Sequence, residues 1–208
     1  MTFCMLRDSQ TTDLKIEKIM DHSTLLFTIT MFFLIAINSS DLFSQSADPF
    51  VPPDFNIPEK LETEKFRLRM LTVNDVVKDY DAVMTSIDHL KGVFGPQSKW
   101  PSKELTLEQD LIDLGWHQKE FQRRSSFAYT VMNREESQCL GCVYIDPTHK
   151  IGYDAEVYLW VRESEIKSGL DSMLYDAVKN WIEAEWPFKK VAFPGREIDW
   201  TTWISLSE

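Results

Sequence analysis

The succession of hydrophobic periods along the chain limits the folds open to this sequence more than any other feature. Three strand-like runs follow one another at 127–132, 139–145 and 155–161, and the polar stretch between the first two is typical of a hairpin loop. Apolar residues at helical spacing flank this block of strands on both sides. This order predicts a mixed sheet with helices packed on its faces.

One strand and two helices are expected before that block. Apolar and basic side chains alternate over 64–71, which predicts a strand. Thr72 with Asp75, and later Thr106 with Gln109, have the spacing of a capping box, so a helix is expected to begin at each. The apolar positions at helical spacing are Val73, Val76, Val77, Tyr80, Val83 and Met84 in the first helix and Leu107, Leu111, Leu114 and Phe121 in the second.

One more helix and a short strand are expected after the block. The helix is predicted to end before Pro187, and residues 190–193 form the last strand. Trp181 and Trp186 are expected to fill core on this helix. The apolar positions of the helix are Leu170, Met173, Leu174, Ala177, Val178, Trp181 and Ile182. The predicted order is β-α-α-β-β-β-α-β, and the fold class is α/β, with an α+β-type mixed sheet.

Residues 1–47 form an N-terminal segment that is interpreted separately from the domain. Residues 25–37 form a continuous apolar run of 13 residues, which is short for a bilayer span of about 20 residues. With Lys15 and Lys18 upstream, the segment is typical of a secretory signal, which predicts an exported or membrane-anchored protein with membrane contact through 25–37. The alternative is an extension translated from the wrong start, which predicts a cytoplasmic protein. Residues 48–60 then form a proline-rich arm, and 61–208 form the domain.

The negative charge of the chain limits the classes of partner that it can bind. The net charge is −11, and a nucleic-acid partner would require a basic surface to meet the phosphate backbone. The part from Asp48 onward is acidic too. We therefore expect no nucleic-acid partner, and a cationic substrate is favoured.

The cysteines and histidines do not predict a metal site. Cys139 and Cys142 form a single Cys-x-x-Cys, and an offset of three places two side chains on opposite faces of a strand. We therefore expect inert structural cysteines rather than a redox pair or half of a zinc site. His89, His117 and His149 have no ligand-like spacing, so surface histidines and no metal are expected.

Three segments resemble the ribosomal-protein N-acetyltransferase branch of the GNAT superfamily of acyl-CoA-dependent N-acyltransferases. Residues 61–72 read LETEKFRLRMLT, and a similar phrase opens members of that branch. Residues 139–143 read CLGCV and look like the third strand of the branch, and residues 155–161 read AEVYLWV and are similar to its fourth strand. The resemblance covers the chain from about Leu61 to Trp200 and implies the acyl-CoA N-acyltransferase-like fold.

The resemblance also implies a site for acetyl-CoA as the acyl donor. The cofactor is expected in a wedge where the fourth and fifth strands splay apart, with its pantetheine along the backbone near Trp160 and Val161. Its pyrophosphate is expected at the start of the following helix, where free N–H groups and the helix dipole favour an anion. The residues expected there are Lys167, Ser168, Gly169, Leu170, Asp171 and Ser172.

The phosphate loop departs from the family pattern. Counting from Val161 puts Ile166 where the family has Gln or Arg, Gly169 at the first small position and Asp171 at the second, so only Gly169 matches. Asp171 adds bulk and negative charge where a phosphate should sit. Weak or altered cofactor binding follows as a hypothesis, and the alternative is that Asp171 is an ordinary first-turn acid stabilised by the helix dipole.

Glu156 and Tyr158 are the candidate catalytic residues. Acetyl transfer to an amine needs a base, and the leaving thiolate needs an acid. Asp154, Glu156, Tyr158 and Trp160 share one face of their strand, so Glu156 could take the proton and Tyr158 could supply one. A solvated polar face or a salt bridge is the alternative for both.

Two functions are therefore open. The first is an enzyme that moves an acetyl group from acetyl-CoA to a primary amine on a small molecule, a peptide N-terminus or a lysine. The second is a non-catalytic module that kept the fold for binding or assembly. The helix with a catalytic tyrosine and the closing strands, which the family commonly has after its fifth strand, are expected to be missing. The edge strand left there could be covered by a second subunit in a homodimer.

Overall fold

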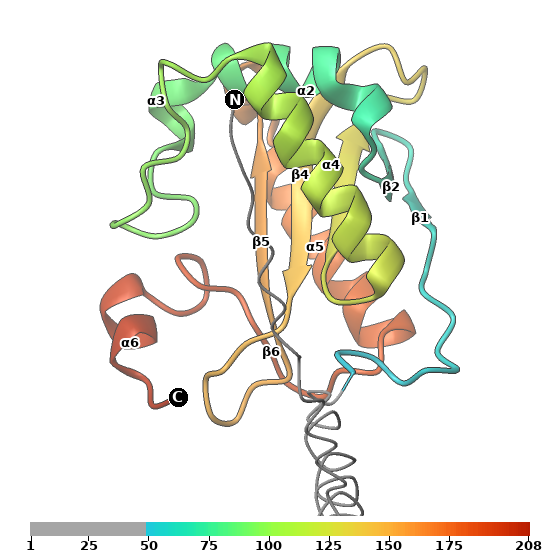
Figure 1. The fold of residues 1–208 in the computed structure, drawn as a ribbon, viewed down its shortest axis with the longest axis vertical. Helices are drawn as coiled ribbons and strands as arrows, with labels where there is room; N and C mark the ends of the chain where they lie inside the picture. Colours follow the sequence, from blue (N-terminus) through green and yellow to red (C-terminus); the bar gives the residue numbers. More distant parts are fainter. Residues whose placement is uncertain (1–48) are drawn as a thin grey trace, which may run out of the picture. The chain divides into compact units, whose positions relative to one another are not determined.

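The computed structural model describes residues 49–208, which are built around one six-stranded sheet (Figure 1). The apolar run at 25–37 and the rest of segment 1–47 lie outside the described residues. Spatial order in the sheet follows chain order: β1 (Lys60–Glu62), β2 (Arg67–Met70), β3 (Phe127–Met132), β4 (Cys139–Asp146), β5 (Ala155–Val161) and β6 (Val191–Ala192). Neighbouring strands are antiparallel except β5 and β6, which are parallel, so the predicted mixed sheet is confirmed.

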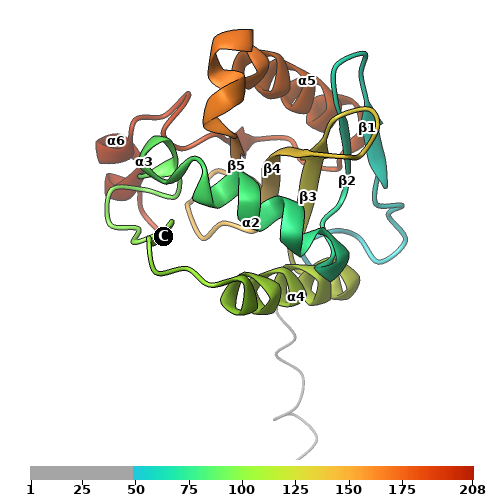
Figure 2. The same ribbon diagram turned by 90° about the horizontal axis from the view of Figure 1, so that it is seen from above.

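Helices cover both faces of the sheet. In both ribbon views α2 and α4 lie on one face and α5 on the other, while α3 and α6 lie beside the β5 edge (Figures 1 and 2). The helices are α2 (Val76–Met84), α3 (Ile87–Leu90), α4 (Leu107–Arg123), α5 (Leu170–Glu185) and α6 (Trp200–Ser205), with 3₁₀ turns η2 (Val73–Asp75) and η3 (Glu163–Ser168). Within residues 49–208, no helix combines the length and the apolar character that crossing a bilayer requires.

The predicted helix starts are confirmed. The Asp75 carboxylate accepts hydrogen bonds from the backbone N–H and the hydroxyl of Thr72, both at 3.0 Å. The Thr106 hydroxyl accepts from the backbone N–H of Gln109 at 3.1 Å. Each contact satisfies a group that a helix start leaves without a partner, so the chain can enter η2 and α4 at these positions.

The predicted first strand, 64–71, is wrong in extent. A turn at Thr63 separates β1 from β2, because the Thr63 hydroxyl accepts hydrogen bonds from the backbone N–H groups of Lys65 and Phe66 at 3.2 and 3.0 Å. A side chain that takes up backbone donors in this way competes with strand pairing. The alternation over 64–71 therefore covers part of a turn and the short β2.

The proline-rich arm packs on the body of the domain. Val51 is 1% exposed, and the Phe50 ring stacks on Phe127 and Phe188 with centroids 5.7 and 5.0 Å apart. The Arg124 guanidinium donates to the backbone carbonyl of Pro52 at 2.7 Å. Residues 49–59 thus contribute core contacts, although the sequence separates them from the domain.

Each face of the sheet has its own core. On the α5 side, Leu174, Val178 and Trp181 pack with the side chains of β3 and β5 that point to that face. Trp181 and Trp186 are buried in this cluster, as predicted. On the other side α2, α3 and α4 pack over a second cluster. Strand β3 is buried at every position because both faces are covered.

The helices on the second face are rotated from the predicted orientation. In α4 the buried residues are Asp110 and Leu114, whereas Leu107 and Leu111 of the predicted apolar stripe are 44% and 43% exposed. In α2 the buried residues are Asp79, Ala82 and Val83, whereas Val77 is 66% exposed. The predicted stripes are wrong at these positions because a carboxylate from each helix points toward the sheet.

The expectation that Cys139 and Cys142 lie on opposite faces is wrong. Met132 pairs with Cys139 but Val131 pairs with Gly141, so Leu140 is an extra residue in β4. This β-bulge shifts the alternation by one, and both thiols then point to the α2 face while Leu140 points to the α5 face. The period-two rule fails here because it assumes an uninterrupted ladder.

The segment after β6 contains a helix that the sequence did not predict. Asp199 caps α6 by accepting from the backbone N–H of Thr202 at 3.0 Å. Within residues 193–208 an isolated bridge between Pro194 and Ile198 is the only strand-like pairing.

Candidate functional site

A cleft opens where β5 and β6 separate. The two strands pair only at Ala155 with Val191 and at Glu156 with Ala192. Beyond these pairs lies a cleft of about 310 Å³ lined by His89, Val93, Leu159, Trp160, Ile166, Gly169, Asp171, Ser172 and Arg196. The predicted fourth and fifth strands are β5 and β6, so the structure contains a wedge where the family resemblance implies one.

The start of α5 forms one wall of this wedge. No side chain caps the helix, so its first N–H groups are open to an anion. Gly169 precedes it with a φ of 76°, a left-handed conformation that glycine adopts without strain. A Cβ at Gly169 would meet nothing within 4 Å, so the backbone conformation, and not close packing, requires glycine here.

The predicted cofactor residues divide into two groups. Four of them line the wedge: Trp160, Gly169, Asp171 and Ser172. The other four do not: the side chains of Val161 and Leu170 are buried in the α5-side core, and Lys167 and Ser168 are exposed on η3. Lys167 thus does not supply the positive charge in the wedge.

Arg196 supplies that charge, and sequence reasoning did not identify it. Its guanidinium donates to both carboxylate oxygens of Asp171, at 2.7 and 2.9 Å, and to the backbone carbonyl of Leu159 at 3.2 Å. The forked pair offsets the negative charge of Asp171. Because Arg196 lies 25 residues after Asp171 in an irregular segment, no periodicity connects the two.

A second cleft lies on the α4 side of the sheet. It has a volume of about 440 Å³ and is lined by Phe94, Ser98, Trp100, Asp113, Trp116, His117, Tyr144 and Asp146. Aromatic faces and carboxylates are the two kinds of group that attract an organic cation. The chemistry of this lining therefore fits an amine.

A carboxylate that lines this cleft, Asp146, is paired with a second carboxylate on the neighbouring strand. Asp146 of β4 and Glu156 of β5 are directly paired across the strands, and both point to the α4 face. Burial, together with the negative charges of Glu156 and Glu120, raises the pKa of Asp146 to about 7. Asp146 can therefore exchange a proton near neutral pH. The sequence signal that could have identified it is the position of Asp146 opposite Glu156 in the hairpin.

The predicted pair Glu156 and Tyr158 is in contact. The Tyr158 hydroxyl donates to Glu156 Oε1 at 3.1 Å, and Trp200 of α6 stacks over the Tyr158 ring with centroids 6.2 Å apart. Burial and the Glu156 charge raise the pKa of Tyr158, so the phenol keeps its proton. Both side chains lie on the face that the alternation predicts, and their catalytic roles stay predictions.

An aromatic wall separates the two clefts. Trp160 lines the wedge, Trp100 lines the second cleft, and their ring centroids are 5.9 Å apart. Phe94 packs edge-on against Trp100, Tyr144 and Tyr158 at centroid distances of 5.0–5.5 Å. The side chains of Trp160 and Tyr158 therefore lie between the wedge and the second cleft.

The histidines are not equally exposed. His89 and His149 lie on the surface, as expected, but His117 is half-buried against Tyr144, with ring centroids 5.2 Å apart. Burial lowers the pKa of His117, and the charges of Glu120 and Asp113 oppose this only in part. The expectation of an exposed residue is wrong for His117, because α4 turns this position toward β4.

Solved structures of acetyltransferases resemble this chain, although no protein-family model and no curated protein matches its sequence. RimL, a ribosomal L7/L12 alpha-N-protein acetyltransferase in its apo form, is 16% identical, with a TM-score of 0.51 over 69% of this chain and 75% of RimL. RimL in complex with coenzyme A is 16% identical, with a TM-score of 0.50 over 65% of this chain and 73% of RimL. The microcin C7 self-immunity acetyltransferase MccE, in complex with acetyl-CoA and AMP, is 11% identical, with a TM-score of 0.51 over 66% of this chain and 73% of MccE. At these identities the comparison shows the fold.

Proposed function

We propose that this chain, which has the acyl-CoA N-acyltransferase fold of the GNAT superfamily, transfers an acetyl group from acetyl-CoA to a primary amine. The observation that carries the proposal is the pair of Asp146, which lines the aromatic cleft, and Glu156, which is paired with it across the strands and bonded to Tyr158. Two of the solved structures are complexes with coenzyme A or acetyl-CoA, which supports the same donor here.

The carboxylate pair is proposed to prepare the amine. A primary amine enters as an ammonium, is attracted by the pair and must lose a proton before it can attack the thioester. A base with a pKa close to the working pH performs this step best, and Asp146 has a pKa of about 7. Glu156 raises that pKa by its charge and holds the Tyr158 hydroxyl, which we propose as the donor to the departing thiolate.

The wedge is proposed to hold the donor. The open N–H groups of α5 favour the pyrophosphate. Among the described residues that line the wedge, Arg196 is the only lysine or arginine, and a guanidinium binds phosphate in the same forked geometry as a carboxylate. Donor binding would then exchange the Asp171 carboxylate for a phosphate as the partner of Arg196.

The same Arg196 supports the alternative, a non-catalytic binding or assembly module. Its bond to the Leu159 carbonyl occupies a β5 backbone group that pantetheine would otherwise be free to reach. If the Arg196–Asp171 pair holds the wedge closed, the chain keeps the fold without the donor. The two proposals differ in one measurable property, which is the affinity for acetyl-CoA.

Thermal unfolding with and without acetyl-CoA separates the two functions. A ligand present at 100 times its Kd stabilises the folded state by about 2.7 kcal/mol, so an enzyme should unfold at a clearly higher temperature with millimolar acetyl-CoA. An unchanged Tm at that concentration would leave only the binding module. Arg196→Ala should weaken any stabilisation, whereas Lys167→Ala, which removes a cation outside the wedge, should not.

Steady-state assays test the carboxylates. With a panel of polyamines and basic peptides as acceptors, and release of the coenzyme A thiol as the readout, Asp146→Asn and Glu156→Gln should each lower kcat by about 10²- to 10⁴-fold while acetyl-CoA still binds. Asp176→Asn removes the same charge from an exposed position on α5 and should leave kcat unchanged. Full activity in both cleft variants would exclude the pair as the base.

A further inference from the structure

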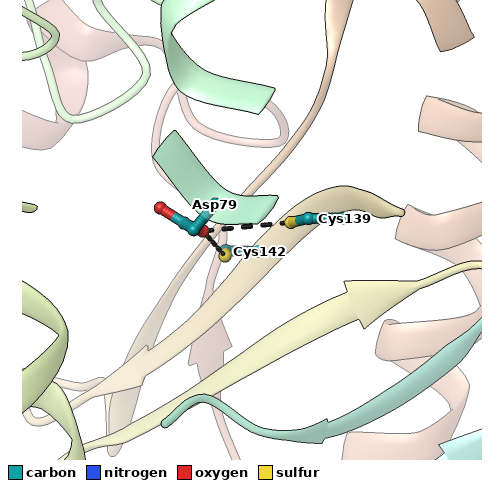
Figure 3. A group of neighbouring side chains, drawn as sticks. All are labelled: Asp79, Cys139 and Cys142. Carbon is teal, nitrogen blue, oxygen red and sulfur yellow. Dashed lines mark hydrogen bonds between the residues drawn. The ribbon is translucent and has the colours of Figure 1, made fainter. Parts of the chain in front are cut away.

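Three metal-ligating side chains meet in a buried cluster outside both clefts (Figure 3). Asp79 comes from α2, and Cys139 and Cys142 come from β4. Asp79 Oδ1 lies 3.2 Å from Cys142 Sγ and 3.9 Å from Cys139 Sγ. The ligand atoms of all three residues lie within 4.8 Å of one another, and no member is more than 4% exposed.

The β-bulge creates this cluster. In a regular strand Cys139 would point to the α5 face, but the extra residue Leu140 turns it to the side of Cys142. Asp79 then reaches the two thiols from above, because α2 packs over this part of β4 with its buried side. A strand irregularity and an inward carboxylate therefore converge on one point.

The distances fit a tetrahedral metal ion. Zn–S bonds of about 2.3 Å and a Zn–O bond of about 2.0 Å at tetrahedral angles place sulfur and oxygen about 3.5 Å apart. The two observed sulfur–oxygen separations, 3.2 and 3.9 Å, lie on either side of this value. The two sulfur–oxygen separations would change by only a few tenths of an ångström on binding the ion.

The carboxylate has no cationic partner. Among residues 49–208, no cation acts on Asp79, and its hydrogen-bond donors are the two thiols. Thiols are weak donors, and a buried carboxylate without strong partners is costly. Arg162, the buried cation nearby, instead donates to the backbone carbonyl of Cys139 and the hydroxyl of Thr85. A metal ion would provide the positive charge that the protein does not.

We propose that Asp79, Cys139 and Cys142 bind a zinc ion that fastens α2 to the bulge of β4. Two thiolates with one carboxylate suit Zn²⁺ and exclude Mg²⁺ and Ca²⁺, which take oxygen ligands. Thr130, fully buried, places its hydroxyl 3.6 Å from Cys139 Sγ and so closes one side of the cluster. The cluster provides three protein ligands and is closed to solvent, so the proposed role of the ion is to hold the two elements together rather than to act on a substrate.

Cobalt substitution tests the site directly. The full chain carrying Cys4→Ser, so that only the two cluster thiols remain, is reduced, stripped with a chelator and titrated with Co²⁺. One equivalent should bind with a near-ultraviolet thiolate-to-cobalt charge-transfer band, and Zn²⁺ should displace it. Cys142→Ser should abolish the band, Asp79→Asn should weaken binding, and Cys4→Ser alone should bind as the unmodified chain does.

Three results would overturn the proposal. The first is no stoichiometric cobalt band while circular dichroism is native and two free thiols react in denaturant. The second is a disulfide between the two cysteines in the protein as purified without oxidant. The third is a band that survives Cys142→Ser. A zinc-dependent rise in Tm that is absent from Cys142→Ser supports the proposal without relying on spectra.

Discussion

On one side of the sheet, a single helix buries only apolar side chains; on the other, two helices bury carboxylates as well. The residues that α5 buries are Leu170, Leu174, Val178, Trp181 and Ile182. Helices α2 and α4 bury Ala82, Val83 and Leu114 together with Asp79 and Asp110. The α5 face is thus built for stability, whereas the other face accepts desolvated charge.

The difference between the two faces shows which side of the sheet can hold buried titratable groups. Burial raises the pKa of Asp79 to about 6 and that of Asp110 to about 7, because neither carboxylate has a cationic partner among the described residues to offset its desolvation. Asp146 and the aromatic cleft lie on the same face. The apolar face can support this arrangement because its own contacts are independent of pH.

The largest effect is expected from a cavity in the apolar face. Leu174 is fully buried, so Leu174→Ala should lower the free energy of unfolding by about 2–5 kcal/mol. Met173, the preceding residue of α5, is 38% exposed, and Met173→Ala should change it by less than about 0.5 kcal/mol. Chemical denaturation measures both, and equal losses would contradict the assignment of α5 as the main source of stability.

The next largest effect is expected at the bulge. A Cβ on Gly141 would lie 1.9 Å from the backbone carbonyl oxygen of Trp160, so Gly141→Ala must push β4 away from β5. A loss of about 1–3 kcal/mol or more is expected. In Gly115→Ala the added methyl meets nothing closer than 3.7 Å and improves helix propensity, so no loss is expected there. If Gly141→Ala left the free energy of unfolding unchanged, the backbone at the bulge would have to move aside at little cost.

A smaller effect, dependent on pH, is expected from Asp110. Burial first, and then the charges of Asp79 and Asp113, raise its pKa to about 7 from an ordinary 3.8. A raised pKa means that the stability contributed by the protonated form is complete below pH 4 and is lost as pH rises through 7. Asp110→Asn should avoid this loss and be more stable than the parent by on the order of 1–3 kcal/mol at pH 8.

The control for this prediction lies on the other face. Asp176 is exposed on α5, and Asp176→Asn should follow the parent across the same pH range. Thermal unfolding between pH 4 and 8 gives both curves. If the Tm of Asp110→Asn and that of the parent changed with pH in the same way, the buried charge of Asp110 would not make the two faces differ in stability.

The smallest effect is expected at the start of α4. This helix buries one apolar residue, Leu114, and therefore depends on its cap more than α5, which has no side-chain cap. Thr106→Ala removes the acceptor for the Gln109 N–H and should lower the free energy of unfolding by about 1 kcal/mol, whereas Thr106→Ser should retain it. An unchanged Thr106→Ala variant would indicate that packing alone holds α4.

The sequence predicts the elements well where burial is regular. The bounds of β3 and β5 agree with the hydrophobic runs because apolar cores cover these strands, and Thr72 and Thr106 mark helix starts by local hydrogen bonds. Each of these signals lies within a few neighbouring residues. Local patterns therefore suffice for most of the framework and for the face on which Glu156 and Tyr158 lie.

The rest depends on contacts between distant segments. The bulge at Leu140 follows from how β4 pairs with β3, and the inward turn of Asp79 follows from how α2 packs on β4. Arg196 reaches Asp171 only after the chain has returned through β6. None of these contacts produces a regular spacing of residues in the sequence. The charge balance of the wedge and the buried cluster therefore could not be predicted.

The order of the strands also has a consequence for how the molecule forms and opens. The three strands β3, β4 and β5 are consecutive in both chain and sheet, so their pairing closes short loops and has a low contact order. Strand β6 joins only after α5 has crossed over, and it is held by two residue pairs. We expect β6 to dock last and detach first, with amide hydrogens that exchange faster than those of β4. Such opening would widen the wedge while the antiparallel strands stay paired.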